Sequence, residues 1–178
     1  ITVGAVYSDS HDVTCFSSWG PTDDGRLKPE LMAPGDEGSC GTNDSSAIEV
    51  YMSPITIQRT TGTSVAAPQV SGGIILLSEQ YRRTYQNFYP KIPLPSTLKG
   101  LLVQGATDLE LTGPDYASGY GLMNLENSVN LVISQKFIER QIFTQGQSNQ
   151  YQIVIEPGTP ELKLTLVWDD LGGSTSSS

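Results

Sequence analysis

The stretch Gly62–Pro68, which reads GTSVAAP, decides how this chain is interpreted. It places Ser64 after a glycine-containing turn and before an apolar segment, 70–77, whose residues recur every three or four positions. This spacing predicts a helix that begins at Ser64. The first N–H groups of a helix lack partners within it and carry partial positive charge, so they stabilise negative charge that develops beside Ser64. The stretch therefore favours acyl-transfer chemistry with Ser64 as the nucleophile.

Three upstream blocks make this motif more specific. They are Ile1–Val6 (ITVGAV), Phe16–Pro21 (FSSWGP) and Lys28–Gly35 (KPELMAPG). Together with Gly62–Pro68, they resemble in order and spacing the landmarks of the subtilisin-like serine proteases. The resemblance covers residues 1 to about 132 and implies the C-terminal part of an α/β protease domain with a parallel sheet. It also implies that Ser64 attacks a peptide carbonyl while its backbone N–H helps form the oxyanion hole.

The resemblance further implies a catalytic Asp and a catalytic His upstream of the nucleophile, in glycine-rich motifs that this chain lacks. The only histidine, His11, lies in a polar turn and is interpreted as a solvated loop residue rather than as the base. Because Ile1 is not a methionine, residue 1 is interpreted as an internal or processed start. We expect the chain to be inactive alone. Either it pairs with the N-terminal half of the same protease after processing, or it is a recombinant fragment.

Two positions near the nucleophile depart from the family pattern. Val65 stands where the family usually has methionine, whose sulfoxide would be bulky and polar beside the reacting centre, so we expect resistance to peroxide. Gln69 stands where many members carry histidine, and we expect no catalytic loss from this change. Thr61 is expected either at the leaving-group rim of the cleft or as a loop residue that satisfies local backbone groups.

The resemblance implies no cofactor, although calcium is frequent in the family. Loops of the chain contain carboxylates at Asp23, Asp24, Asp36, Glu37 and Asp44. Their spacing is not that of an EF-hand, so they are interpreted as solvated turn residues, with a structural calcium site as the alternative.

Periodicity and turn residues predict the other elements of the protease part. The expected strands are 1–6 and 13–18, a brief apolar piece at 31–33, and a hairpin over 48–58 around Ser53-Pro54; the expected helices run from Ser64, from Ser96 as N-cap to about 106, and over 125–132. Gly72 and Gly73 reduce helix propensity, so their presence suggests that the first helix packs closely against a sheet.

Beyond residue 133 the pattern changes to alternation of apolar and polar residues. The segments 151–155 and 162–168 are predicted to be antiparallel strands of an incomplete β-sandwich. They resemble the jelly-roll domain that follows the protease domain in a subgroup of large subtilases. The predicted organisation is therefore 1–132 for the protease part, 133–171 for the sandwich and 172–178 for a flexible glycine- and serine-rich tail.

Composition narrows the range of partners and compartments. The net charge is −9 and the sequence has no basic cluster, which argues against nucleic acid and anionic membranes as partners. No apolar run is long enough to span a bilayer. Few charged residues and 18 glycines are typical of a secreted hydrolase. In that setting a Cys15–Cys40 disulfide would close a loop of about 25 residues and contribute roughly 3 kcal/mol, with two buried free thiols as the alternative.

Three other functions compete with that of a protease. A non-catalytic subtilase-like binding protein would differ only in lacking the upstream Asp and His motifs. A lipase or esterase elbow needs glycine two residues after the serine, where this chain has Ala66. A plain buried helix with a serine N-cap leaves the three upstream blocks unexplained. The leading hypothesis is therefore a fragment of a secreted serine endopeptidase that acts on proteins or peptides.

Overall fold

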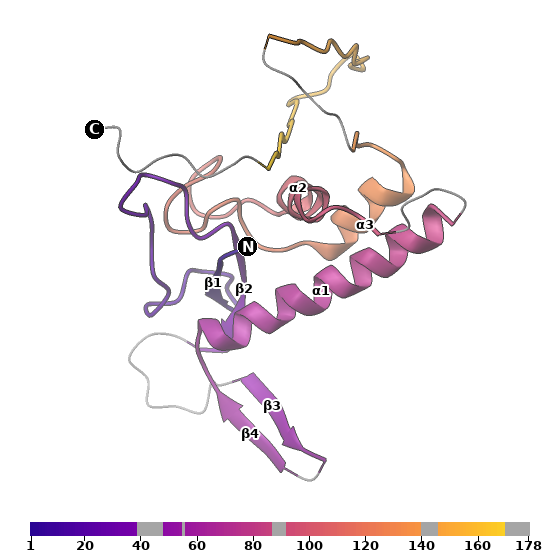
Figure 1. Ribbon diagram of the computed structural model, residues 1–178. Helices are drawn as coiled ribbons and strands as arrows, with labels where there is room; N and C mark the ends of the chain where they lie inside the picture. The colour runs from indigo at the N-terminus through magenta and orange to yellow at the C-terminus, as the bar shows by residue number, and fades with distance from the viewer. Residues whose placement is uncertain (39–47, 55, 87–91, 140–145, 170–178) are drawn as a thin grey trace.

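Two short parallel strands, β1 (Val3–Tyr7) and β2 (Leu31–Asp36), form the sheet against which the first helix packs. The computed structural model describes residues 1–38, 48–54, 56–86, 92–139 and 146–169 (Figure 1). The buried strand predicted at the N-terminus is confirmed as β1. The expected apolar piece is also a strand, but β2 continues through Pro34 to Asp36, where the sequence predicted a stop.

The predicted strand over 13–18 is wrong, because this segment does not form the regular backbone hydrogen bonds of a strand with β1. Only Val13 forms an isolated bridge, to Val6, and the chain then turns. The Thr14 N–H donates to the Ala5 carbonyl oxygen at 3.0 Å, and the Ala5 N–H donates to Ser17 Oγ at 3.0 Å. These two contacts satisfy the backbone of Ala5 without a regular strand beside it.

Helix α1 (Thr63–Thr84) confirms the helix predicted from Ser64 and contacts both strands. Pro68 lies in its second turn. An added Cβ at Gly73 would lie 2.9 Å from Met123 Sδ, whereas one at Gly72 would meet no atom within 4 Å. The close approach therefore involves Gly73 alone, and its neighbour is Met123 rather than the predicted sheet.

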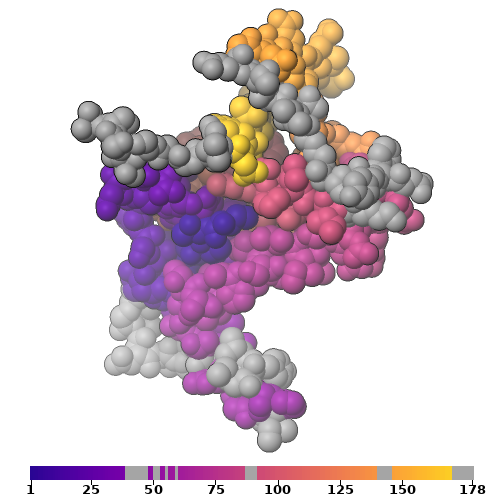
Figure 2. All heavy atoms as spheres, in the orientation of Figure 1, coloured from indigo at the N-terminus to yellow at the C-terminus, as the bar shows by residue number. Residues whose placement is uncertain are grey.

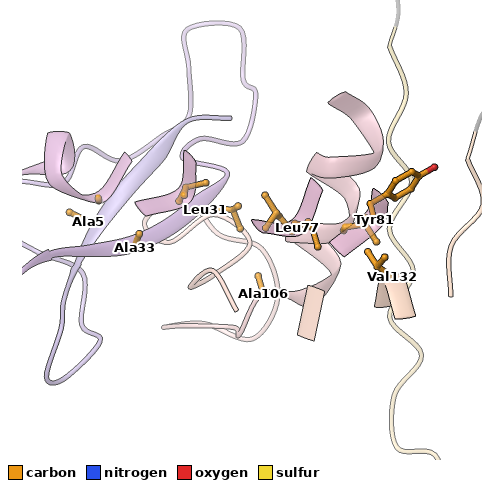
Figure 3. Packing of buried hydrophobic residues seen from close by; sticks show 11 residues of the cluster. Ala5, Leu31, Ala33, Leu77, Tyr81, Ala106 and Val132 are labelled. Atoms are coloured by element: carbon orange, nitrogen blue, oxygen red, sulfur yellow. The ribbon is translucent and has the colours of Figure 1, made fainter. Parts of the chain in front are cut away.

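Helices α2 (Pro95–Gly105) and α3 (Leu125–Ile133) complete the helical layer, and both were predicted. The N-cap of α2 is Leu94 rather than Ser96, because Pro95 occupies the first helical position, where a missing N–H costs little. The three helices and the sheet enclose one apolar core, shown in Figure 3; its buried members are Ala5, Leu31, Ala33, Ala66, Val70, Leu77, Tyr81, Leu101, Leu102, Ala106 and Val132.

The predicted hairpin is confirmed as β3 (Ile48–Ser53) and β4 (Thr56–Thr60), which pair in antiparallel fashion. It projects away from the helices and leads directly into the start of α1 (Figure 1). The hairpin and the C-terminal end of β2 therefore both approach the first turn of α1.

The β-sandwich predicted beyond residue 133 is not confirmed. Across 146–169 no residue belongs to a strand, although Pro157 and Gly158 form a turn between the two segments. Ile153 and Leu166, which belong to the predicted apolar faces, are 51% and 79% exposed, so these faces are not covered. Figure 2 shows the residues near 150 standing away from the packed part of the chain. Alternating residues form a stable sheet only when partner strands and a covered face are available.

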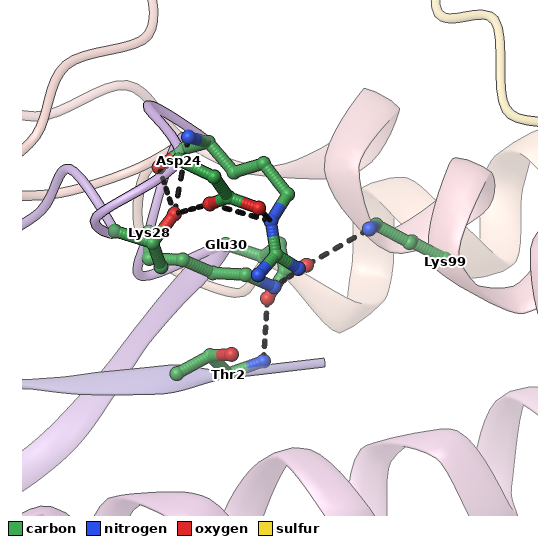
Figure 4. A network of polar contacts seen from close by, with 7 residues as sticks. Thr2, Asp24, Lys28, Glu30 and Lys99 are labelled. Atoms are coloured by element: carbon green, nitrogen blue, oxygen red, sulfur yellow. Dashed lines mark hydrogen bonds and ion pairs between the residues drawn. The ribbon is translucent and has the colours of Figure 1, made fainter. Parts of the chain in front are cut away.

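A buried carboxylate, Glu30, joins the starts of both strands to α2 (Figure 4). Glu30 Oε2 accepts the Thr2 N–H at 2.5 Å, and Oε1 accepts Lys99 Nζ at 2.8 Å and a hydrogen bond from Lys28. Burial would raise the pKa of Glu30, but the hydrogen bonds from Lys28, Lys99 and Thr2 lower it to about 2. Glu30 is therefore charged at neutral pH.

No helix in the described part of the chain combines the length and apolarity that a membrane span requires.

Candidate active site

Ser64 is the second residue of α1, and its side chain is exposed. Among the residues that the structure describes, none forms a hydrogen bond with its hydroxyl group. The hydroxyl is therefore free to contact a ligand. The position at the N-terminus of a helix of 22 residues places it in the region of positive potential that the peptide dipoles create.

The backbone around Ser64 provides a free donor. The Val65 and Ala66 N–H groups both donate to the Gly62 carbonyl oxygen, at 2.9 and 3.4 Å. Within the described segments, the Ser64 N–H has no backbone acceptor. An oxyanion that forms on a carbonyl carbon attacked by Ser64 Oγ would lie close to this unpaired N–H.

Gly62 allows the turn that exposes the serine. Its φ is 134°, a backbone conformation that residues with a side chain rarely adopt. An added Cβ at Gly62 would also lie 3.2 Å from Ser64 Oγ. Glycine is therefore required here both for the backbone conformation and for the space around the hydroxyl group.

The turn is attached to the sheet. The Gly62 N–H donates to the Gly35 carbonyl oxygen of β2 at 2.9 Å. One residue before that acceptor, the Pro34 carbonyl oxygen accepts Gln69 Nε2 at 2.6 Å. Both contacts fix the first turns of α1 relative to the C-terminal end of β2.

A groove of about 660 Å³ lies beside Ser64. Residues from the C-terminal ends of β1 and β2, from the hairpin and from α1 line it: Ser8, Pro34, Glu37, Ile48, Glu49, Thr60, Ser64, Val65, Pro68 and Gln69. Sequence reasoning missed Ser8 and Thr60, which no local pattern marks. Gln69 lies four residues after Val65, a spacing that places both on the same helix face and could have indicated it. Thr61, the expected rim residue, is exposed but does not line this groove.

The structure does not bring His11 to the serine. His11 is exposed, adopts a φ of 65° and donates its backbone N–H to the Tyr7 carbonyl oxygen at 3.0 Å. It is not among the residues that line the groove, and the sequence contains no other histidine. The groove is therefore lined by Ser64 and by no histidine.

The loop carboxylates that the structure describes do not gather into a metal site. In the described part of the chain, no group of three or more His, Cys, Asp or Glu side chains is placed to hold a metal ion. Asp24 instead accepts hydrogen bonds from Thr22 Oγ1 and Arg26 Nε, which lower its pKa to about 2. Asp44 lies outside the described residues. A calcium site stays a prediction that this donor set does not support.

Cys15 is disulfide-bonded. Its predicted partner, Cys40, lies outside the described residues. Disulfides persist in oxidising compartments, so the state of Cys15 agrees with the expectation of a secreted protein.

Comparison with protein families gives a match to the subtilase family (Peptidase S8) over residues 1–121. The whole chain is 30% identical over 201 aligned positions to the serine protease/ABC transporter B family protein tagA of Dictyostelium discoideum, covering 99% of this chain and 11% of that protein. It is 38% identical over 96 positions to the C5a peptidase of Streptococcus pyogenes, covering 53% of this chain and 7% of that protein.

Two further proteases are similar. Pyrolysin of Pyrococcus furiosus is 33% identical over 124 positions, covering 65% of this chain and 8% of that protein. The solved structure of the CspB protease of Clostridium perfringens superposes with a TM-score of 0.61 at 27% identity, covering 75% of this chain and 26% of that one. The chain spans about a tenth of the length of the curated relatives that it matches. These matches, and the parallel sheet with its three helices, show that the chain belongs to the subtilase family of serine proteases.

Proposed function

We propose that this chain supplies the nucleophile of a subtilisin-like serine endopeptidase, with the catalytic Asp and His provided by a segment upstream of residue 1. One observation carries the proposal: Ser64 has a free hydroxyl and an unpaired backbone N–H at the start of α1, in an open groove. This is the local arrangement that nucleophilic attack on a carbonyl requires.

The chemistry proceeds in two stages. Ser64 Oγ attacks the carbonyl carbon of a peptide bond while the upstream histidine accepts its proton, and the Ser64 N–H donates to the oxyanion that forms. The tetrahedral intermediate collapses to an ester on Ser64 and releases the amine, which takes the proton from the histidine. A water molecule then hydrolyses the ester by the same steps. No cofactor enters this sequence, and the substrates are proteins or peptides.

A binding role without catalysis is the alternative, and the residues upstream of residue 1 distinguish the two. If the upstream segment lacked the catalytic Asp or His, the groove beside Ser64 would bind a chain without cleaving it. The proposed location is extracellular in either case, because Cys15 is disulfide-bonded.

Labelling with a fluorophosphonate tests the proposal, because this reagent modifies only activated serines. We expect labelling at Ser64 in the protein that includes the upstream segment, no labelling of residues 1–178 alone, and none in the Ser64→Ala variant. Labelling of residues 1–178 alone would contradict the need for an upstream base. Absence of labelling in the longer protein would favour the binding role.

A further inference from the structure

Gln69 connects the helix that carries Ser64 to the sheet through its side chain. Gln69 Nε2 donates to the Pro34 carbonyl oxygen of β2 at 2.6 Å and to the Val65 carbonyl oxygen of its own helix at 3.2 Å. The side chain is half-buried and lines the groove beside Ser64. Both hydrogen atoms of the amide group are therefore used, one on each element.

The first turns of α1 need such a contact because Pro68 weakens them. In an α-helix the N–H of residue 68 would donate to the carbonyl oxygen of Ser64, and proline has no N–H. The segment that carries the nucleophile therefore lacks one of its own helical hydrogen bonds. The Gln69 side chain adds a hydrogen bond to the carbonyl oxygen of Val65, the residue after Ser64, and another to the Pro34 carbonyl oxygen of the sheet.

The contacts of Gln69 and Gly62 act on consecutive residues of β2. Gly62 donates its N–H to the Gly35 carbonyl oxygen, and Gln69 donates to that of Pro34. Ser64 lies between the two donors in the sequence. The backbone on each side of the nucleophile is thus attached to the same end of the same strand.

We propose that Gln69 is a positioning residue, which holds the Ser64 hydroxyl and N–H in their reactive orientation by fixing α1 against Pro34. The inference rests on the proposed protease function. The property that matters is a side-chain N–H that reaches the Pro34 oxygen. Histidine also has a ring N–H, so a histidine at this position would be able to retain the contact.

The experiment compares three substitutions in the complete protease that contains this chain: Gln69→Leu, Gln69→His and Gln69→Glu. Gln80→Leu is the matched control, because Gln80 lies on the same helix and donates to Thr84 Oγ1 at 3.1 Å, away from the groove. The measurements are kcat, KM, the rate of fluorophosphonate labelling at Ser64, and the thermal midpoint. All activities are measured well below the lowest midpoint.

We expect Gln69→Leu to lower kcat and the labelling rate about tenfold or more, with KM changed by less than about twofold, because misplacement of a reacting group reduces the chemical step. Gln69→His should retain both rates within about threefold, and Gln80→Leu should match the parent. In Gln69→Glu the ionised carboxylate cannot donate to Pro34. Its labelling rate relative to the parent should therefore rise as the pH falls towards 5, where the protonated carboxyl group can donate.

Parent-like labelling of Gln69→Leu would overturn the inference. An equal loss in Gln80→Leu, or in Gln69→His, would also overturn it, because the loss would then follow from general damage to the helix. If the parent itself is not labelled at Ser64, the proposed protease function fails and Gln69 has no nucleophile to position. Labelling of the parent separates the two failures.

Discussion

At the scale of single residues, we expect the side chain that follows the proposed nucleophile Ser64 to determine how the site responds to oxidants. Val65 is buried, lines the groove and directly follows Ser64. A methionine there would be oxidised to a polar sulfoxide beside the reacting serine. Among the described methionine side chains, Met32 is fully buried and Met123 is half-buried and packs on Gly73, and neither lines the groove.

We therefore predict that Val65→Met makes the complete protease sensitive to peroxide. The variant should lose most of its activity in peroxide while the parent retains most of its own, and mass spectrometry should find the added oxygen on residue 65. Loss of activity in the parent at the same rate would contradict the prediction. Activity measured before treatment provides the control for the substitution itself.

Single residues also show what the sequence could and could not predict. Ser64 was identified because its neighbours form a contiguous motif, and the structure exposes its hydroxyl at the predicted helix start. Gln69 was interpreted as structural within the helix, because its partner Pro34 lies 35 residues away. The burial of Glu30 was not predicted for the same reason, since its partners Thr2 and Lys99 are 28 and 69 residues distant. Contacts over such distances leave no local pattern.

At the scale of elements, the charge of Glu30 links the starts of β1 and β2 to α2, and the stability of this junction should depend on pH. The pKa of Glu30 is lowered from 4.5 to about 2 in the folded chain. Below pH 4.5 the Glu30 carboxylate binds a proton more readily in the unfolded chain than in the folded chain. The contribution of Glu30, about 3 kcal/mol, is therefore fully present above pH 4.5 and is lost as the pH falls towards 2.

We predict that Glu30→Gln removes this part of the pH dependence. In urea unfolding, the parent should lose about 3 kcal/mol more than the variant between pH 5 and pH 2. The exposed residue Glu156 offers a control, and Glu156→Gln should keep the slope of the parent. Equal slopes for the parent and Glu30→Gln would show that the buried carboxylate does not control acid stability.

The elements that are marked by a short pattern in their own sequence were predicted well. Helix α3 follows from its apolar spacing and from Asn124, whose side chain accepts the Asn127 N–H at 3.0 Å. The hairpin β3–β4 follows from two short β-prone runs around a turn. The segments 151–155 and 162–168 have an equally clear alternation but form no strands, because a strand also needs a partner that the pattern does not specify.

At the scale of the whole molecule, the segment 163–167 lies along α2 through polar contacts. Gln104 Nε2 donates to the Lys163 carbonyl oxygen at 3.0 Å, and Thr165 Oγ1 donates to Gln104 Oε1 at 2.6 Å. Lys163 Nζ lies 3.3 Å from the Val103 carbonyl oxygen, near the negative end of the α2 dipole. The side chains of Gln104 and Lys163 thus hold this segment to α2.

We predict that Gln104→Ala loosens the segment without unfolding the core. Each lost hydrogen bond contributes about 1 kcal/mol, so limited proteolysis between 146 and 169 should accelerate at least fivefold. Gln80→Ala, on α1, serves as the control and should be cleaved at the parent rate. Unchanged cleavage of Gln104→Ala would show that other contacts hold the segment.

The pairing of β1 with β2 also bears on when the turn before Ser64 forms during folding. Val3 pairs with Leu31, and the turn before Ser64 then attaches to Gly35, so both contacts join residues that are more than 25 positions apart. Closing such loops costs entropy before the contacts repay it, so non-local pairs form slowly. We therefore expect the turn that carries Ser64 to attach to β2 late in folding, so that a partly folded chain has not yet fixed the hydroxyl and N–H of Ser64 in place.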